Sequence, residues 1–318
     1  MKHVYAPAIC AALLLAVTGH AQYPRLWGMC ASGGATNQGT IFRVDGDGTD
    51  YTVEFDFDDS SGYSPEGSLC LAPNGKLYGM TNLGGSGSPA GGTVFSFDPS
   101  GGVFEKLVDF NVSNGGFGWG GMIVGADGKL YGASYGGGSG GSIFSMDPAT
   151  DSYTILYALT EDDDGSAINN KLSQAPDGKL YGLCSQGGAD DAGTLFSYDI
   201  TTDVFTNLHD FDGSGNGSTP YGQPCLADNG WIYGTTYGGG VNSEGILWKY
   251  DPVSDAFVKL LDFDGDNGQT PWNAPIRVAP DLLMGTVTWG GSNAGGLIYS
   301  LVPSTDQFTE VYSFSPVD

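Results

Sequence analysis

The sequence predicts an all-β fold, a six-bladed β-propeller of four-stranded antiparallel blades, from three observations. A short apolar segment that ends in glycine occurs six times, at intervals of 50 to 53 residues. Turn-forming residues divide each repeat into four short strands, and no amphipathic helix of useful length follows residue 21. Four antiparallel strands in a repeat of about 50 residues are typical of a propeller blade. A stacked β-solenoid is the alternative, but its coils are usually shorter.

The apolar segment is the second strand of each repeat. Its copies are Leu26-Trp27-Gly28, Leu77-Tyr78-Gly79, Leu130-Tyr131-Gly132, Leu180-Tyr181-Gly182, Ile232-Tyr233-Gly234 and Leu283-Met284-Gly285. Four copies follow an Asn-Gly or Asp-Gly pair, such as Asn74-Gly75, which is a strong hairpin signal because both residues tolerate a positive φ. The first and second strands should therefore pair antiparallel. In the second repeat the four strands are expected at 67–72, 76–81, 93–97 and 103–110.

The third and fourth strands have different compositions. The third opens with glycine before β-branched and aromatic residues, as in Gly92-Thr93-Val94-Phe95, which suits a buried pleated surface. The fourth mixes charged and apolar residues, as an exposed outer edge requires. Only Gln22 to Arg25 precede the second strand of the first repeat. We therefore expect either a blade with three strands or a natural chain that continues beyond Asp318.

The N-terminus resembles an export signal. Met1-Lys2-His3 is basic, an apolar run follows, and small residues stand before Gln22. We expect a signal peptide at 1–21, a secreted or cell-surface protein, and no membrane span in the mature chain, because the apolar run is too short. Residues 22–318 should form one propeller domain. Its repeats are expected at about 22–64, 65–117, 118–167, 168–219, 220–270 and 271–318.

The acidic composition excludes one class of partner. The full chain has 36 Asp and Glu against 11 Lys and Arg, a formal net charge of −25. Such a field repels nucleic acid, so neither DNA nor RNA is an expected partner.

Four cysteines follow the predicted signal, and they occupy only two positions of the repeat. Cys30 and Cys184 lie four residues after the start of the second strand, whereas Cys70 and Cys225 lie seven residues before it. Among the three possible pairings, only Cys30 with Cys70 and Cys184 with Cys225 joins neighbouring repeats in both cases. We expect these two disulfides in an oxidising environment, and four buried free thiols are the alternative.

The sequence offers few candidates for catalysis. His209 is the one histidine after residue 21, so a nucleophile–histidine arrangement has a single candidate base and a site built from several histidines has none. Carboxylates are numerous, so a paired-carboxylate glycosidase remains an alternative, although no two carboxylates stand out. We assign no catalytic residue.

Acidic residues gather after the fourth strands. Asp210 and Asp212 follow one of these strands, and Asp262, Asp264 and Asp266 follow the next. Carboxylates on a glycine-containing loop are ligands that Ca²⁺ accepts, so calcium is the one candidate cofactor. Solvated turns that use Asp side chains explain the same residues equally well.

A second set of candidates lies eleven residues before the second strand. These positions hold Glu66, Trp119, Asn169, Tyr221 and Trp272. If the first strand is innermost, they form a ring near one mouth of the channel, where aromatic faces beside polar groups could bind sugar. Packing between blades is the alternative interpretation.

The repeat resembles that of the choice-of-anchor tandem repeat GloVer-containing protein family. The resemblance rests on Gly-Thr-Ile/Val-Phe, on Asp47-Gly48-Thr49-Asp50-Tyr51-Thr52-Val53 and on Asp-Gly-x-Leu-Tyr-Gly, and it extends from Leu26 to Phe314. It implies an exported, propeller-like protein that is often held at the surface by a C-terminal sorting segment, and it supplies no catalytic residues. The sequence stops at Asp318 without such a segment, which fits a natural chain that continues further.

These observations favour a secreted or cell-surface binding module, for polysaccharide or for a surface protein. An extracellular propeller enzyme of the glycosidase or lyase type is the alternative, and a purely structural surface protein is a third interpretation.

Overall fold

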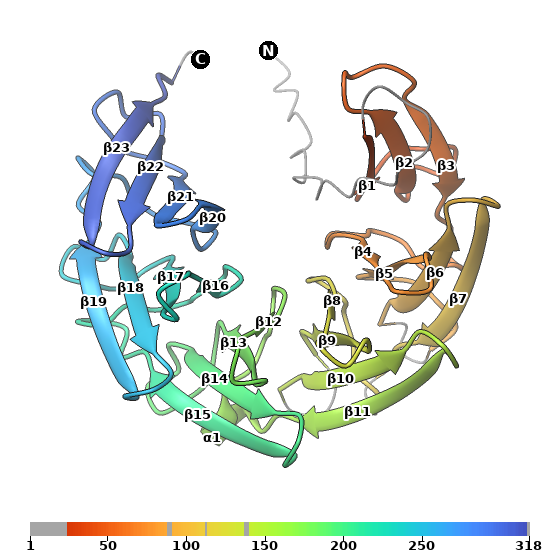
Figure 1. The fold of residues 1–318 in the computed structure, drawn as a ribbon, viewed down its shortest axis with the longest axis horizontal. Coiled ribbons are helices and arrows are strands. Elements are labelled where there is room, and N and C mark those ends of the chain that lie inside the picture. The colour runs from red at the N-terminus through yellow and green to blue at the C-terminus, as the bar shows by residue number, and fades with distance from the viewer. Residues whose placement is uncertain (1–23, 88–90, 112, 137–139, 317–318) are drawn as a thin grey trace. The chain divides into compact units, whose positions relative to one another are not determined.

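The computed structural model describes residues 24–316, except 88–90, 112 and 137–139. The predicted signal peptide at 1–21 lies outside the described residues. In the part that is described, the strands form one three-stranded and five four-stranded antiparallel sheets (Figure 1). The prediction of an all-β, six-bladed propeller is therefore confirmed, with one blade that has three strands.

The chain divides into two compact units, and the division falls within β11, after Leu156. The first unit holds blades 1 to 3. Blade 1 consists of β1 (Arg25–Cys30), β2 (Thr40–Asp45) and β3 (Thr52–Asp56), and blade 2 of β4 (Cys70–Leu71), β5 (Leu77–Thr81), β6 (Thr93–Asp98) and β7 (Val103–Asp109). Blade 3 consists of β8 (Ile123–Val124), β9 (Leu130–Ser134), β10 (Ser142–Asp147) and β11 (Ser152–Ala158). The single domain predicted over 22–318 and its repeat boundaries stay predictions.

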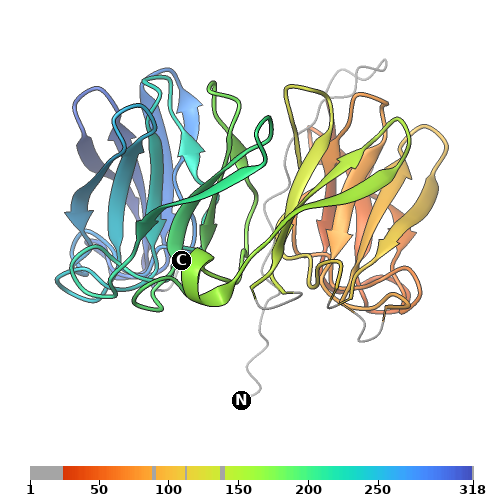
Figure 2. The same ribbon diagram turned by 90° about the horizontal axis from the view of Figure 1, so that it is seen from below.

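The second unit holds blades 4 to 6. It contains α1 (Glu161–Asp164), and blade 4 consists of β12 (Ser173–Gln174), β13 (Leu180–Cys184), β14 (Thr194–Asp199) and β15 (Val204–Asp210). Blade 5 consists of β16 (Cys225–Leu226), β17 (Ile232–Thr236), β18 (Ile246–Asp251) and β19 (Ala256–Asp262). Blade 6 consists of β20 (Ile276–Ala279), β21 (Leu282–Val287), β22 (Leu297–Val302) and β23 (Gln307–Ser313). Figure 2 shows the strands of each unit running between two layers of turns.

The hairpin between the first and second strands forms as predicted, but its geometry differs in one respect. In blade 2, Gly75 N donates to Ala72 O at 2.9 Å, and Gly75 has a φ of +83°. Asn74 is not among the residues with positive φ; instead its side chain accepts from Lys76 N at 3.0 Å. The glycine alone therefore supplies the left-handed conformation, and Asn74 stabilises the turn with its side chain.

The glycine of each second strand makes room for an aromatic ring. Gly79 pairs with Phe95 across β5 and β6, and a Cβ atom at Gly79 would lie 2.5 Å from Phe95 Cζ. The same relation holds between Gly28 and Phe42, at 2.6 Å, and the ring or indole of the third strand takes this place in the other blades. Because the ring lies over the glycine, a larger residue fits there only if the ring or the strand moves.

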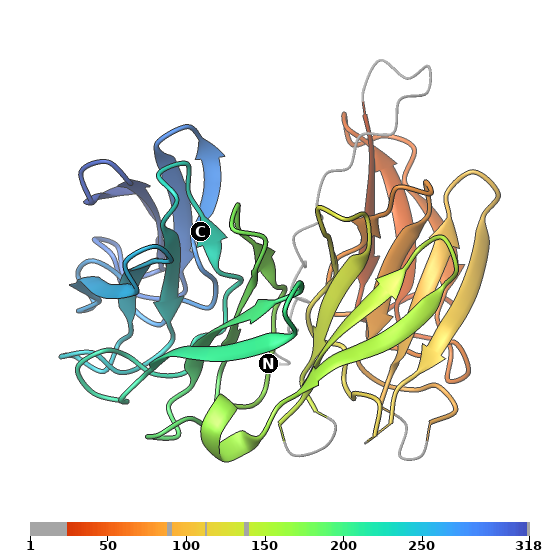
Figure 3. The same cartoon turned by 60° about the horizontal axis from the view of Figure 1, so that its bottom comes forward.

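The hydrophobic core lies between blades. We call the side that packs on the next blade the forward face; in blade 2 it consists of Tyr78, Met80, Val94 and Phe110. The side that packs on the preceding blade is the rear face; in blade 3 it consists of Leu130, Phe144 and Met146. All seven side chains are at most 3% exposed. The same two faces meet between blades 1 and 2, 4 and 5, and 5 and 6. Figure 3 shows the sheets that carry these faces from a third direction.

Candidate functional site

The five residues predicted to form a ring lie where the chain enters the first strand of each blade. Within the second unit, Asn170 Nδ2 donates to Tyr221 O at 2.7 Å, so the entry segments of blades 4 and 5 are neighbours. A Cβ atom at Gly222 would lie 1.9 Å from Ala274 N, which places the entries of blades 5 and 6 equally close. In the first unit, a Cβ atom at Gly67 would lie 1.5 Å from Gly120 O. Neighbouring entries therefore touch within each unit, and the complete ring stays a prediction.

Three aromatic side chains gather at the entries of blades 5 and 6. We call Tyr221, Tyr237 and Trp272 the aromatic patch. Tyr221 and Trp272 are stacked, with ring centroids 4.9 Å apart and an interplanar angle of 12°. Tyr237 packs edge-on against both, with centroids 5.8 Å from Tyr221 and 4.9 Å from Trp272. Trp272 remains 50% exposed, so part of its indole surface faces solvent.

Backbone bonds fix the segments that carry the patch. Tyr237 N donates to Thr219 O at 3.1 Å, which holds the end of β17 against the segment before Tyr221. Thr270 N donates to Glu244 O at 2.8 Å, which ties the segment before Trp272 to blade 5. The patch is thus held by main-chain contacts on both sides, and its rings are positioned before any ligand arrives.

The equivalent positions in the other blades have different partners. Trp119 is 38% exposed, and the centroid of its ring lies 6.0 Å from the centroid of the Tyr135 ring. Asn169 Nδ2 donates to Ser185 Oγ at 2.7 Å, and Glu66 accepts from Ser64 Oγ at 3.2 Å. The structure therefore brings Tyr221 and Trp272 together in the second unit, whereas Trp119 and Glu66 belong to the first.

Tyr237 and Tyr135 are functional candidates that the sequence reasoning missed. Each lies sixteen residues after an aromatic entry residue, Tyr221 or Trp119, directly after the second strand. Where the entry residue is the polar Asn169, the corresponding residue is the polar Ser185. This matching of residue types at a fixed spacing was the available signal, although it fails in blade 6, where the polar Thr288 follows Trp272 at the same spacing.

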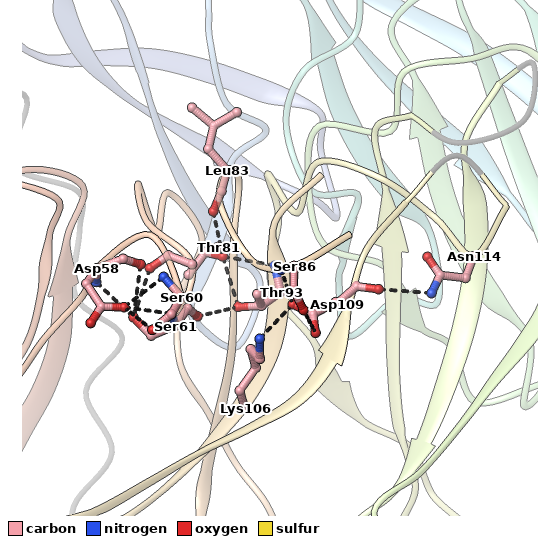
Figure 4. Close-up of polar contacts among 11 residues, drawn as sticks. Asp58, Ser60, Ser61, Thr81, Leu83, Ser86, Thr93, Lys106, Asp109 and Asn114 are labelled. Carbon is pink, nitrogen blue, oxygen red and sulfur yellow. Dashed lines mark hydrogen bonds and ion pairs between the residues drawn. The ribbon is translucent and has the colours of Figure 1, made fainter. Parts of the chain in front are cut away.

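The carboxylates at the ends of the fourth strands hold the glycine-rich loops (Figure 4). Asp109 accepts from Ser86 N at 2.7 Å and from Lys106 Nζ at 2.8 Å. Asp210 accepts from Ala189 N at 3.0 Å in the same way, and Asp262 accepts from Val241 N at 2.8 Å. Burial raises the pKa of Asp109, but its bonds to Lys106 and Ser86 outweigh that effect and hold the pKa below its usual value.

The acidic residues two positions later form turns. Asp212 accepts from Ser214 N at 2.8 Å and from Asn216 N at 3.0 Å, and these bonds lower its pKa. Asp264 accepts from Asn267 N at 3.0 Å. Asp266 is exposed. Within the described residues, no three His, Cys, Asp or Glu side chains gather as a metal site would require. Asp210, Asp212, Asp262 and Asp264 thus accept bonds that hold turns and loops, and a calcium site at these residues and Asp266 stays a prediction.

The two predicted disulfides are absent, because no disulfide joins any described residues. Cys184 is the fifth residue of β13, whereas Cys225 pairs with Tyr233, the second residue of β17. The two cysteines of this pair thus lie at levels of the blade that differ by three residues along the second strand. Cys30 and Cys70 differ in level in the same way. Three residues along a strand span about 10 Å, which exceeds the roughly 7 Å that a disulfide allows between Cα atoms. The sequence argument matched the repeats correctly but ignored depth along the strand. Burial raises the pKa of Cys184 to about 12 and that of Cys225 to about 11.

His209 packs between blades. Its ring is stacked on Phe257 with centroids 3.7 Å apart and an interplanar angle of 5°. Burial lowers its pKa, and Nε2 has no hydrogen-bond partner among the described residues. The geometry therefore gives His209 a packing role.

Comparison with known proteins identifies the repeat. The model of the Gloeobacter/Verrucomicrobia repeat matches residues 17–174 and 139–318. The chain belongs to this family. The resemblance to GloVer-containing proteins is therefore confirmed. A search of curated proteins gave no match.

Solved structures share the fold of this Gloeobacter/Verrucomicrobia repeat protein. The periplasmic gluconolactonase PpgL of Pseudomonas aeruginosa is 15% identical, with a TM-score of 0.59 over 91% of this chain and 83% of that one. TolB from Acinetobacter baumannii is 16% identical, with a TM-score of 0.51 over 92% of this chain and 66% of that one. A puromycin-hydrolyzing peptidase of Mycobacterium tuberculosis is 11% identical, with a TM-score of 0.58 over 93% of this chain and 44% of that one. At these identities the likeness shows the fold alone.

The described part of the chain contains no helix with both the length and the apolar character needed to cross a bilayer.

Proposed function

We propose that the chain is an exported binding module that takes neutral polysaccharide at the aromatic patch. The observation that carries the proposal is the half-exposed indole of Trp272, which is held in place by stacking on Tyr221. The apolar C–H face of a sugar ring packs on such a surface, because an aromatic face offers a large contact area that loses little conformational freedom.

The charge of the chain supports an uncharged ligand. At a formal net charge of −25, an anionic polysaccharide would be repelled, and a neutral glycan would not. Export is supported by the basic start and apolar run of residues 1–21. Recovery of the natural protein outside the cytoplasm with Gln22 at its N-terminus would test this part, and retention of Met1 in the cytoplasm would contradict it.

The binding test compares two tryptophans of blade 6. Residues 22–318 are titrated by calorimetry with xylan, mannan and cello-oligosaccharides, with alginate as the anionic comparison, each with and without calcium. We expect Trp272→Ala to weaken neutral-glycan binding about tenfold or more, equivalent to ~1.4 kcal/mol, because the stacking surface is lost. Trp289→Ala is the matched control, because Trp289 is 56% exposed but lies outside the aromatic patch.

Equal affinity of Trp272→Ala and Trp289→Ala would place binding elsewhere and contradict the proposal. Binding of no neutral glycan by the folded wild-type chain would also contradict it. The Trp119→Ala variant then reports whether the first unit contributes a second surface, which would appear as a change in the number of sites at unchanged affinity.

A further inference from the structure

The first unit holds a polar counterpart of the aromatic patch at the junction of blades 2 and 3. At the positions of Tyr221, Tyr237 and Trp272 it has Glu66, Asn82 and Trp119, which we call the polar trio. All three belong to the first unit. Asn82 N donates to Ser64 O at 3.1 Å, as Tyr237 N donates to Thr219 O in the patch. The same backbone arrangement therefore carries both sets of side chains.

The segment that carries Trp119 touches blade 2 on both sides of this residue. A Cβ atom at Gly118 would lie 2.6 Å from Met80 Cβ, near the end of β5. A Cβ atom at Gly67 would lie 1.5 Å from Gly120 O, at the entry of blade 2. The three side chains of the polar trio thus come from segments that are in contact within one unit.

The indole of Trp119 lacks the ring cover that Trp272 has. Tyr221 and Tyr237 of the preceding blade both pack on Trp272. Among the residues that the structure describes, the ring contact of Trp119 is with Tyr135 of its own blade. The blade 2 members of the polar trio carry a carboxylate and an amide instead of rings. The indole is therefore flanked by polar oxygens on the side where the patch has aromatic cover.

Asn82 makes the observation that points to a ligand. Its side chain is 6% exposed, and Oδ1 has no hydrogen-bond partner in the part of the chain that the structure describes. In blade 4 the polar residues at the two equivalent positions, Asn169 and Ser185, bond to each other at 2.7 Å. A buried amide oxygen without a donor is unfavourable. Rotation about χ2 exchanges the two ends of the amide, so this oxygen can turn toward a ligand that brings a donor.

We propose that the polar trio binds an amino sugar, with the sugar ring on the indole of Trp119 and the ammonium group between Glu66 and Asn82. Both polar side chains offer acceptors, and an ammonium group brings three donors. Its positive charge is attracted by the carboxylate, by the indole face and by a chain with a net charge of −25. The site is separate from the aromatic patch and does not rest on the binding of neutral glycan there.

Other cationic ligands match the polar trio less well. A quaternary ammonium group has no donor for Asn82, and a lysine side chain has no flat face for the indole of Trp119. A protonated glucosamine unit supplies the donors, the charge and the apolar C–H face together. The structure therefore favours a glycan of glucosamine units over its N-acetylated form, which is neutral.

The test titrates residues 22–318 by calorimetry with the β-1,4-linked tetramer of glucosamine at about pH 5.5. The fully N-acetylated tetramer is the neutral comparison, and 0.15 M NaCl screens the general attraction of the acidic chain. We expect Glu66→Gln and Trp119→Ala each to weaken binding about tenfold or more. Asn82→Ser, which copies Ser185 of blade 4, should weaken it about threefold or more. Glu105→Gln is the matched control, because Glu105 is an exposed carboxylate on β7 of the same blade, and this variant should bind within a factor of two of wild type.

Equal affinity of Glu66→Gln and Glu105→Gln would overturn the proposal, because general charge alone would then attract the glucosamine tetramer. Binding of the acetylated tetramer as tightly as the charged one, or no binding of the charged one, would overturn it as well. Trp272→Ala should leave the affinity for the glucosamine tetramer within a factor of two, and its loss in this variant would place the ligand at the aromatic patch instead. Failure of this site and failure of the neutral-glycan site are therefore distinguishable. Circular dichroism of each variant establishes that it is folded.

Discussion

Replacement of Gly79 by alanine tests the packing that the repeated glycine permits. The new methyl carbon would lie 2.5, 3.0 and 3.1 Å from three atoms of the Phe95 ring. Carbon atoms make favourable contact at about 3.5–4.0 Å, so the ring or the strand must move by about 1 Å. Phe95 is fully buried, and its ring packs 5.3 Å from Phe57 and 5.2 Å from Phe104. Overpacking of this kind costs about 1–3 kcal/mol, and the closed surroundings place Gly79→Ala near the upper end.

Two further glycines of blade 2 separate the clash from other effects of alanine. Gly75 has a φ of +83°, and a Cβ atom there would meet no other atom within 4 Å, so Gly75→Ala isolates backbone strain, at about 1–2 kcal/mol. Gly101 has its nearest neighbours at 3.5 Å and no positive φ, so Gly101→Ala should be neutral or stabilise by about 0.4–1 kcal/mol.

Urea unfolding of residues 22–318, followed by tryptophan fluorescence, gives the free energy of unfolding of each variant. The Gly79→Ala/Phe95→Leu double variant completes a cycle, because a smaller side chain at position 95 should recover about 1 kcal/mol or more of the loss caused by Gly79→Ala. If Gly79→Ala is as stable as Gly101→Ala, or if the cycle shows no coupling, the steric explanation of the repeated glycine is wrong.

Three other predictions concern titration and access. The folded pKa of Asp109 lies below its unfolded value, so the stability that Asp109 contributes is present above about pH 3.9 and is lost as the pH falls through the folded pKa. Asp109→Asn should therefore reduce the loss of stability in acid, as measured by denaturation curves at several pH values. An unchanged dependence of stability on acid pH would contradict this prediction. Burial lowers the folded pKa of His209, so protonation favours unfolding and the stability should fall as the pH drops below about 6.5. His209→Phe, which reproduces the Phe55–Phe104 stack, should remove that decline. If the stability of the variant declines with pH as steeply as that of the wild type, His209 is not the group responsible. Cys184 should resist maleimide labelling at pH 8 until the chain unfolds, because it is fully buried and its pKa is raised to about 12. Rapid labelling of the native protein would contradict this prediction. A disulfide at Cys184, found by mass analysis of unreduced peptides, would contradict it as well.

The strands and blades could be predicted because their signals are local and repeated. Leu77-Tyr78-Gly79 after Asn74-Gly75 contains both the strand and the turn that precedes it, and the hairpin forms there. The packing between blades could not be predicted, because the contact between Phe55 and Phe104 depends on registers across two sheets. The cysteine pairing failed for the same reason.

The candidate site was predicted in part. The position of Trp272 at an entry segment follows from the repeat, but its stacking on Tyr221 requires two blades to be placed side by side. The acidic residues were ambiguous because carboxylates that bind calcium and carboxylates that hold turns have the same composition. Backbone bonds such as those from Val241 N to Asp262 and from Ala189 N to Asp210 show the second role, and they are visible only in the structure.

The location of the core between sheets also bears on how such a chain lengthens during evolution. Each blade offers one kind of surface forward and its complement to the rear, so a duplicated repeat inserted at any junction meets suitable neighbours on both sides. Gene duplication can therefore add or remove whole blades without new core residues. The entry position eleven residues before the second strand already differs among the repeats, with Glu66, Trp119, Asn169, Tyr221 and Trp272, so a copied blade can change this residue while its core faces are retained.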